Sequence, residues 1–84
     1  KIKVMTKMKR NGEYLYLFNW VDGGFNDVWA PNMKEARRRV AQEQKDHNKK
    51  YPDSVILKAD PKSFRKASYK QYEAQNRMGW MMSL

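Results

Sequence analysis

The sequence predicts a small α+β domain of order β-β-β-α-β-α, with a mainly antiparallel sheet and helices packed on it. Lysines alternate with apolar residues over 1–9, and the Asn-Gly pair at 11–12 is typical of a hairpin turn. A helical spacing of apolar residues follows Pro31, and a second helix signal begins at Asp60-Pro61. Because 84 residues form at most a modest core, we expect one domain, 1–84.

The first three strands form a meander. Residues 1–9 have the period of a half-buried strand, and a two-residue turn at 11–12 pairs Arg10 with Glu13 and Lys9 with Tyr14. The second strand runs over 13–21. A turn at 22–24 precedes a third strand over 25–30.

The remaining elements follow from capping signals and composition. Asn32 is a predicted N-cap for a helix over 33–47, and the apolar run 55–57 is a predicted fourth strand. The second helix is expected from Asp60-Pro61 to about residue 77, and the apolar segment 80–84 is expected to dock on the domain.

Extending the hairpin register through the turn near 22–24, on the assumption that this turn has an even number of residues, divides the sheet into two faces. The aliphatic face, expected beneath the first helix, collects Ile2, Val4, Thr6, Met8, Leu15, Leu17, Val21, Val28 and Ala30. The opposite face collects lysines and rings, namely Lys3, Met5, Lys7, Lys9, Tyr14, Tyr16, Phe18, Trp20, Phe25, Asp27 and Trp29.

The charge points to an anionic partner. Eighteen Lys and Arg residues against nine Asp and Glu give a net charge of +9, which favours nucleic acid or an acidic protein. Rings among lysines can stack on bases while the ammonium groups contact phosphates. The candidate nucleic-acid-binding or partner-binding residues are Lys3, Lys7, Lys9, Tyr14, Tyr16, Trp20, Trp29, Arg38 and Arg39.

Residues suited to catalysis or metal binding are few. The chain has no cysteine and one histidine, His47, and its carboxylates are scattered singly. We therefore expect no catalytic residues, no metal site, no cofactor and no enzymatic activity. No apolar run approaches the length of a membrane span, and a cytoplasmic location without membrane association is expected.

Three alternatives remain open at this point. The rings can be ordinary core, covered by the second helix or by the tail. The protein can instead be a small accessory or inhibitor module, of the kind that phages and mobile elements encode, which docks on a host or partner protein. A homodimer that buries the two aromatic faces together is the third.

The order strand, strand, strand, basic helix, with Val-Trp-Ala-Pro-Asn-Met-Lys-Glu-Ala at 28–36, resembles the small DNA-binding modules at the N-termini of tyrosine integrases. The resemblance covers about residues 10–44, and the second half of the chain departs from it. It implies a sheet that enters the major groove of DNA.

Overall fold

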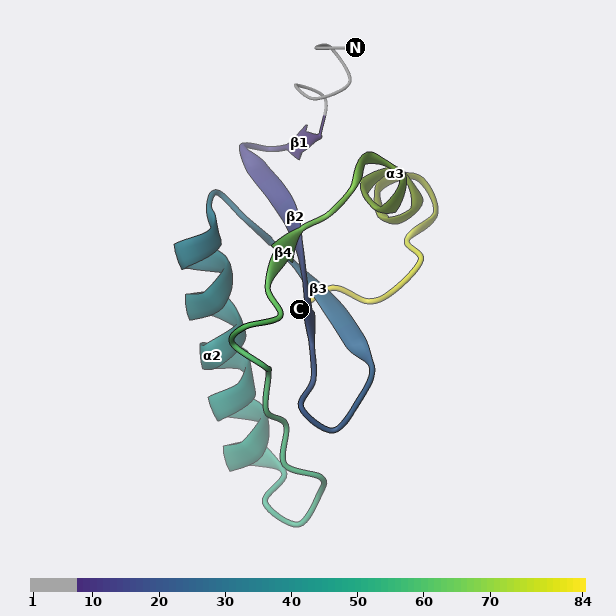
Figure 1. Cartoon of the computed structure of the whole chain (residues 1–84). Coiled ribbons are helices and arrows are strands. Elements are labelled where there is room, and N and C mark those ends of the chain that lie inside the picture. Colours follow the sequence, from purple (N-terminus) through teal and green to yellow (C-terminus); the bar gives the residue numbers. More distant parts are fainter. Residues whose placement is uncertain (1–7) are drawn as a thin grey trace.

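The computed structural model describes residues 8–84 and confirms the predicted α+β order (Figure 1). The elements are β1 (Lys9–Arg10), β2 (Glu13–Asn19), β3 (Phe25–Ala30), α2 (Met33–Lys50), β4 (Arg65–Lys66) and α3 (Tyr69–Met78). Lys3 and Lys7, with most of the strand expected over 1–9, lie outside the described residues.

β2 is the central strand of an antiparallel sheet. β3 pairs with one edge of β2, and β1 and β4 share the other edge. The turn between β1 and β2 has positive φ at Asn11 (53°) and Gly12 (79°), as a two-residue hairpin requires. The pairs Lys9–Tyr14 and Arg10–Glu13 confirm the predicted register of this turn.

Helices cover both faces of the sheet (Figure 1). Ala36 and Val40 of α2 pack in one core cluster with Tyr16, Phe18 and Val28. On the opposite face, Tyr72 of α3 packs with Leu15, Leu17 and Trp29. The sheet is therefore the middle layer of the molecule, with a separate small core on each side.

The predicted division of the two faces is correct for the residues of β1 and β2, but it is wrong for β3 and for the face that the first helix covers. Tyr16 pairs with Val28, and the ladder ends at Asn19–Phe25, so the connecting loop 20–24 has five residues, an odd number. A shift of one residue exchanges the faces of a strand. As a result Tyr14 and Tyr16 lie on the α2 side together with Val28, whereas Leu15 and Leu17 lie on the other side.

The fourth strand also differs from the prediction. Residues 55–57 are irregular, and the side chains of Val55 and Ile56 are 70% and 56% exposed. Residues 58–60 pair instead with residues 19–21 of the β2 segment, and 65–67 pair with 15–17. Between these two stretches, the four residues 61–64 lie opposite a single residue of β2, Phe18. The strand therefore bulges here, with three extra residues.

β4 pairs with the same edge of β2 as β1 does. Arg65 and Lys66 occupy the edge of β2 at Leu17 and Tyr16, where an extended first strand was expected to pair. Within residues 8–84, β1 pairs with β2 through Lys9 and Arg10. This arrangement places β1 and β4 next to each other along one edge.

The second helix starts later than predicted. Asp60 begins a turn instead, since its carbonyl oxygen accepts from the Ser63 N–H at 3.0 Å. Ser68 is the N-cap of α3, and with Gln71 it forms a complete capping box. The capping box explains why the helix starts here and why residues 62–66 lie outside it.

The segment after α3 returns to the sheet as expected. Gln75 binds it through both ends of its side-chain amide, which donates to the Ser83 hydroxyl and accepts from the Met81 N–H. The Trp80 ring lies 5.9 Å from that of Phe25, although Trp80 stays 38% exposed. Within residues 8–84, the helices are too short or too polar to cross a membrane.

Candidate nucleic-acid interface

Two of the predicted interface rings are buried on opposite sides of the sheet. Tyr16 is 6% exposed beneath α2, and Trp29 is 8% exposed beside α3. Burial also raises the pKa of the Tyr16 hydroxyl above its usual value. Neither ring can stack on a base without unpacking a core, so for these two residues the alternative that the rings belong to the core applies.

Trp20 is half-buried at the edge of the α2-side core. Its ring packs edge-on against Phe18, with centroids 4.9 Å apart. This contact gives the Trp20 side chain a structural role in the core.

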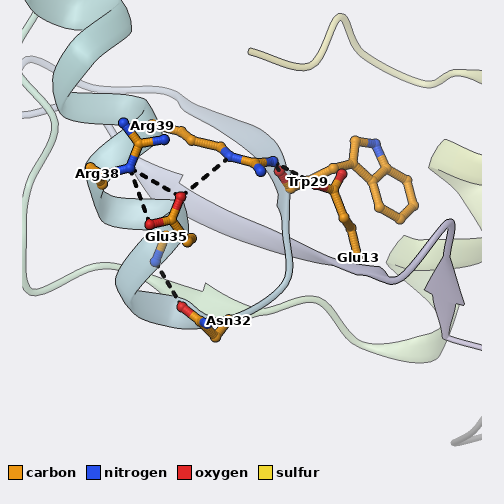
Figure 2. A network of polar contacts seen from close by, with 6 residues as sticks. All are labelled: Glu13, Trp29, Asn32, Glu35, Arg38 and Arg39. Carbon is orange, nitrogen blue, oxygen red and sulfur yellow. Dashed lines mark hydrogen bonds and ion pairs between the residues drawn. The ribbon is translucent and has the colours of Figure 1, made fainter.

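The two predicted arginines of α2 are engaged in ion pairs (Figure 2). Arg38 pairs with Glu35 at 3.0 Å. Arg39 donates to the Glu13 carboxylate at 2.7 Å and to the Trp29 carbonyl oxygen at 2.6 Å. The backbone N–H of Glu35 also donates to the side chain of Asn32, which is the N-cap of α2. The positive charges of Arg38 and Arg39 are thus largely offset within the domain.

Tyr14 and Lys9, by contrast, lie together in a more exposed cluster. The Lys66 ammonium group lies 3.7 Å from the centroid of the Tyr14 ring, and that of Lys9 lies 5.3 Å from it. Lys9 pairs with Tyr14 across the hairpin, while Lys66 pairs with Tyr16 on the same face. Two ammonium groups from distant parts of the chain therefore converge on one half-buried ring.

A second ring and cation continue this cluster. Phe64 lies in the bulge before β4 and stacks on Phe18, with centroids 5.1 Å apart. The Arg37 guanidinium lies over Phe64 at 5.4 Å. We call these five residues the cation–ring row: Lys9, Tyr14, Lys66, Phe64 and Arg37.

The charges of the row have no acidic partner in the described part of the chain. There, the ion pairs join carboxylates only to Arg38, Arg39 and Arg77. Three cations from β1, β4 and α2 therefore create positive potential beside two half-buried rings. Cations that accompany aromatic rings in this way can contact phosphates and stack on bases.

The sequence indicated only part of this row. Lys9 and Tyr14 were predicted together, because a local hairpin brings them into register. Lys66 and Phe64 both fall within the predicted second helix, and Arg37 falls within the predicted first helix. No sequence signal places Lys66 beside Tyr14 or Phe64 beside Phe18, because both contacts depend on the pairing of β4 with β2.

The opposite face of the sheet carries a cation–π contact of a different kind. The Arg10 guanidinium lies 3.8 Å from the centroid of the Trp29 ring, and the Tyr72 ring packs edge-on against the same indole. Trp29 is buried by these neighbours. We therefore infer that this contact contributes to the stability of the fold.

Asp27 is a buried carboxylate beside that core. It is fully buried, and neither carboxylate oxygen has a hydrogen-bond partner of normal geometry. Burial raises the pKa of the Asp27 carboxyl, although the Ser83 hydroxyl, the Trp80 indole and the Arg10 guanidinium partly oppose this. The described residues contain no group of three or more His, Cys, Asp or Glu side chains that could hold a metal ion.

Comparisons with known proteins identify no relative. No protein-family model, no curated protein and no solved structure matches the chain. The functional argument therefore depends on the geometry of the cation–ring row.

Proposed function

We propose that this protein is a non-enzymatic nucleic-acid-binding domain whose contact surface is centred on the cation–ring row. The observation that carries the proposal is the convergence of Lys9, Lys66 and Arg37 on two rings, with no carboxylate paired to them in residues 8–84. The net charge of +9 adds long-range attraction for any polyanion.

The row suits contacts to the nucleic-acid backbone. Lys and Arg side chains bind phosphates and release condensed counterions, which makes affinity steeply dependent on salt. The three cations lie on three different elements of the fold, so their relative positions are set by the sheet and by α2 and not by one flexible segment. A preorganised row of this kind loses less side-chain entropy on binding.

The test compares two variants with the same change in charge. The first replaces Lys9, Lys66 and Arg37 with Gln. The control replaces Lys45, Lys49 and Lys70 with Gln, because these lysines are exposed and lie away from the row on α2 and α3. Binding of labelled single-stranded DNA, duplex DNA and RNA is measured by fluorescence anisotropy over a salt series.

We expect the row variant to lose more affinity than the control. The slope of log affinity against log salt should fall by about 0.7–0.9 for each lost phosphate contact. Equal losses in both variants would mean that only the net charge matters and would contradict the assignment to the row. Failure of the unaltered protein to bind any probe at low salt would overturn nucleic-acid binding as the function.

A second candidate, binding to an acidic protein, is favoured by the loop 51–57. Asn48 holds this loop by two hydrogen bonds to the Leu57 backbone, at 2.8 and 2.9 Å. The loop exposes Val55 and Ile56, and the exposed residues Lys49, Lys50 and Lys58 flank it. An acidic partner with an apolar pocket would match this surface.

A further inference from the structure

A groove adjoins the cation–ring row between α2 and residues 59–64. Its volume is about 240 Å³, and its apolar lining consists of Val40, Ala41, Ala59, Pro61 and Phe64. Val40 is almost fully buried, whereas Ala41 is exposed at the margin. The groove therefore runs from the surface to the edge of the core cluster that lies between the sheet and α2.

Polar groups lie at the margin of this groove. Arg37 contributes a cation. The side-chain oxygen of Gln44 accepts from the Ala59 N–H at 2.8 Å, which orients the amide and leaves its NH₂ group as a donor at the groove. The groove thus combines an apolar lining with one cation and one oriented amide donor. These features suit a planar ligand that forms hydrogen bonds and carries an anionic group.

Phe64 can accept a stacked partner on its groove side. Its ring stacks on the buried ring of Phe18. The Arg37 guanidinium stands over Phe64 at 5.4 Å, farther than the 3.8 Å at which Arg10 contacts Trp29. The looser contact leaves Arg37 free to move onto a phosphate or onto the face of an inserted ring.

We propose that this groove holds one unpaired base of a single-stranded nucleic acid, with a neighbouring phosphate on Arg37 or Lys66. The inference rests on the proposed function and narrows its ligand. A duplex presents phosphates to the row, but its bases are paired and stacked, so it has no base to place in the groove. A single strand supplies both contacts, since its bases can turn outward and stack on aromatic side chains.

The first experiment compares three probes of equal length: oligothymidine, a strand of abasic residues, and a duplex. All three carry phosphates, and only the first carries unpaired bases. We expect oligothymidine to bind about 5- to 150-fold more tightly than the abasic strand, the range expected for one stacked base. Equal affinity for these two strands would overturn the base pocket while leaving phosphate binding by the row in place.

The second experiment fills the groove without altering the core. Ala41→Tyr introduces a ring from an exposed position of α2 that lines the groove. Gln42→Tyr is the matched control, because Gln42 is an exposed α2 residue outside the groove lining. We expect A41Y to lose the preference for oligothymidine over the abasic strand and to keep its affinity for the abasic strand and the duplex.

The control Q42Y should bind all three probes as the unaltered protein does. An A41Y variant that folds and keeps its preference for oligothymidine would overturn the inference. Absence of binding to every probe at low salt would instead overturn the proposed function, so the two failures are distinguishable. Circular dichroism of both variants verifies that the fold is retained.

Discussion

The backbone N–H of Leu84 donates a 3.0 Å hydrogen bond to the carbonyl oxygen of Asp27, which brings the segment after α3 to the outer edge of β3. An unprotected edge strand invites pairing with another chain. Here the Asn26 side chain accepts from the Asp27 N–H, and Arg39 donates to the Trp29 carbonyl oxygen. Side chains and the tail thus engage several backbone groups along this edge.

Removal of residues 80–84 should therefore destabilise the domain and promote association. The deletion removes the hydrogen bond from Leu84, the contact of Trp80 with Phe25 and both partners of the Gln75 amide. We expect the melting temperature to fall by about 5–10 °C, since 1 kcal/mol corresponds to about 4–8 °C in a domain of this size. Circular dichroism and light scattering measure the two effects.

The matched control for the deletion is Met82→Ser. Met82 belongs to the same segment, but it is 89% exposed, so this substitution should leave the melting temperature unchanged. An unchanged melting temperature and a monodisperse sample after deletion would show that the tail contributes nothing to the fold.

Asp27→Asn should stabilise the protein at neutral pH. Burial raises the pKa of the folded-state carboxyl above its ordinary value of 3.8, so the folded state binds the proton more tightly than the unfolded state. The stabilisation by this proton is complete below the ordinary pKa and is lost as the pH rises through the folded-state pKa. Asparagine stays neutral at every pH, so D27N does not lose stability in this way as the pH rises.

Thermal melts between pH 4 and pH 7 test this linkage. The difference in unfolding free energy between D27N and the unaltered protein should grow in favour of D27N as the pH rises. The control Asp53→Asn removes an exposed carboxylate and should not reproduce the gain in stability of D27N at pH 7. If D27N is less stable than the unaltered protein, and the difference in unfolding free energy is the same at pH 7 as at pH 4, the role assigned to the raised pKa is contradicted.

The sequence was sufficient wherever a feature depends on neighbouring residues. The Asn11-Gly12 turn, the Asn32 cap and the end of α3 before Gly79 follow from local conformational preferences. The order of the first three strands and the first helix follows from the same signals. On this local basis Lys9 and Tyr14 were correctly placed beside each other.

Features that depend on distant pairing were not predictable. The assignment of faces depended on whether the loop 20–24 has an odd or even length, and no single residue in the loop determines that. β4 pairs with β2 across some fifty residues of sequence, and its exposed residues Arg65 and Lys66 lack the apolar alternation of a strand. Most of the cation–ring row depends on this pairing, so it was found only in the structure.

Asn48→Ala should loosen the loop 51–57 without unfolding the domain. The Asn48 side chain supplies both hydrogen bonds to Leu57, and no other residue in the described chain replaces them. The amide hydrogen of Leu57 should therefore exchange faster in the variant. Hydrogen exchange measured by NMR detects the change.

The Ala59 amide provides an internal control for that measurement. It donates to the Gln44 side chain and does not contact Asn48, so its protection should be retained. Equal protection of Leu57 in N48A and the unaltered protein would show that Asn48 does not hold the loop. Loss of protection at both amides would show that the substitution disturbs α2 more widely.

Arg38→Gln and Arg39→Gln should differ in their effect on stability, although the two arginines are neighbours in α2. Arg38 is 60% exposed and pairs only with Glu35, so its loss should change the free energy of unfolding by less than about 1 kcal/mol. Arg39 bridges Glu13 on β2 and the Trp29 carbonyl oxygen on β3 (Figure 2). Its loss should cost about 1–3 kcal/mol, because two charge-assisted hydrogen bonds between the helix and the sheet disappear.

Urea denaturation of both variants measures this difference, and raising the salt concentration tests its origin. Salt screens an exposed ion pair, so the small effect of R38Q should shrink further at high salt. The Arg39 contact to a carbonyl oxygen is not an ion pair, so much of the R39Q effect should persist. Equal losses of stability in the two variants would show that Arg39 does not join the helix to the sheet in the way that these distances indicate.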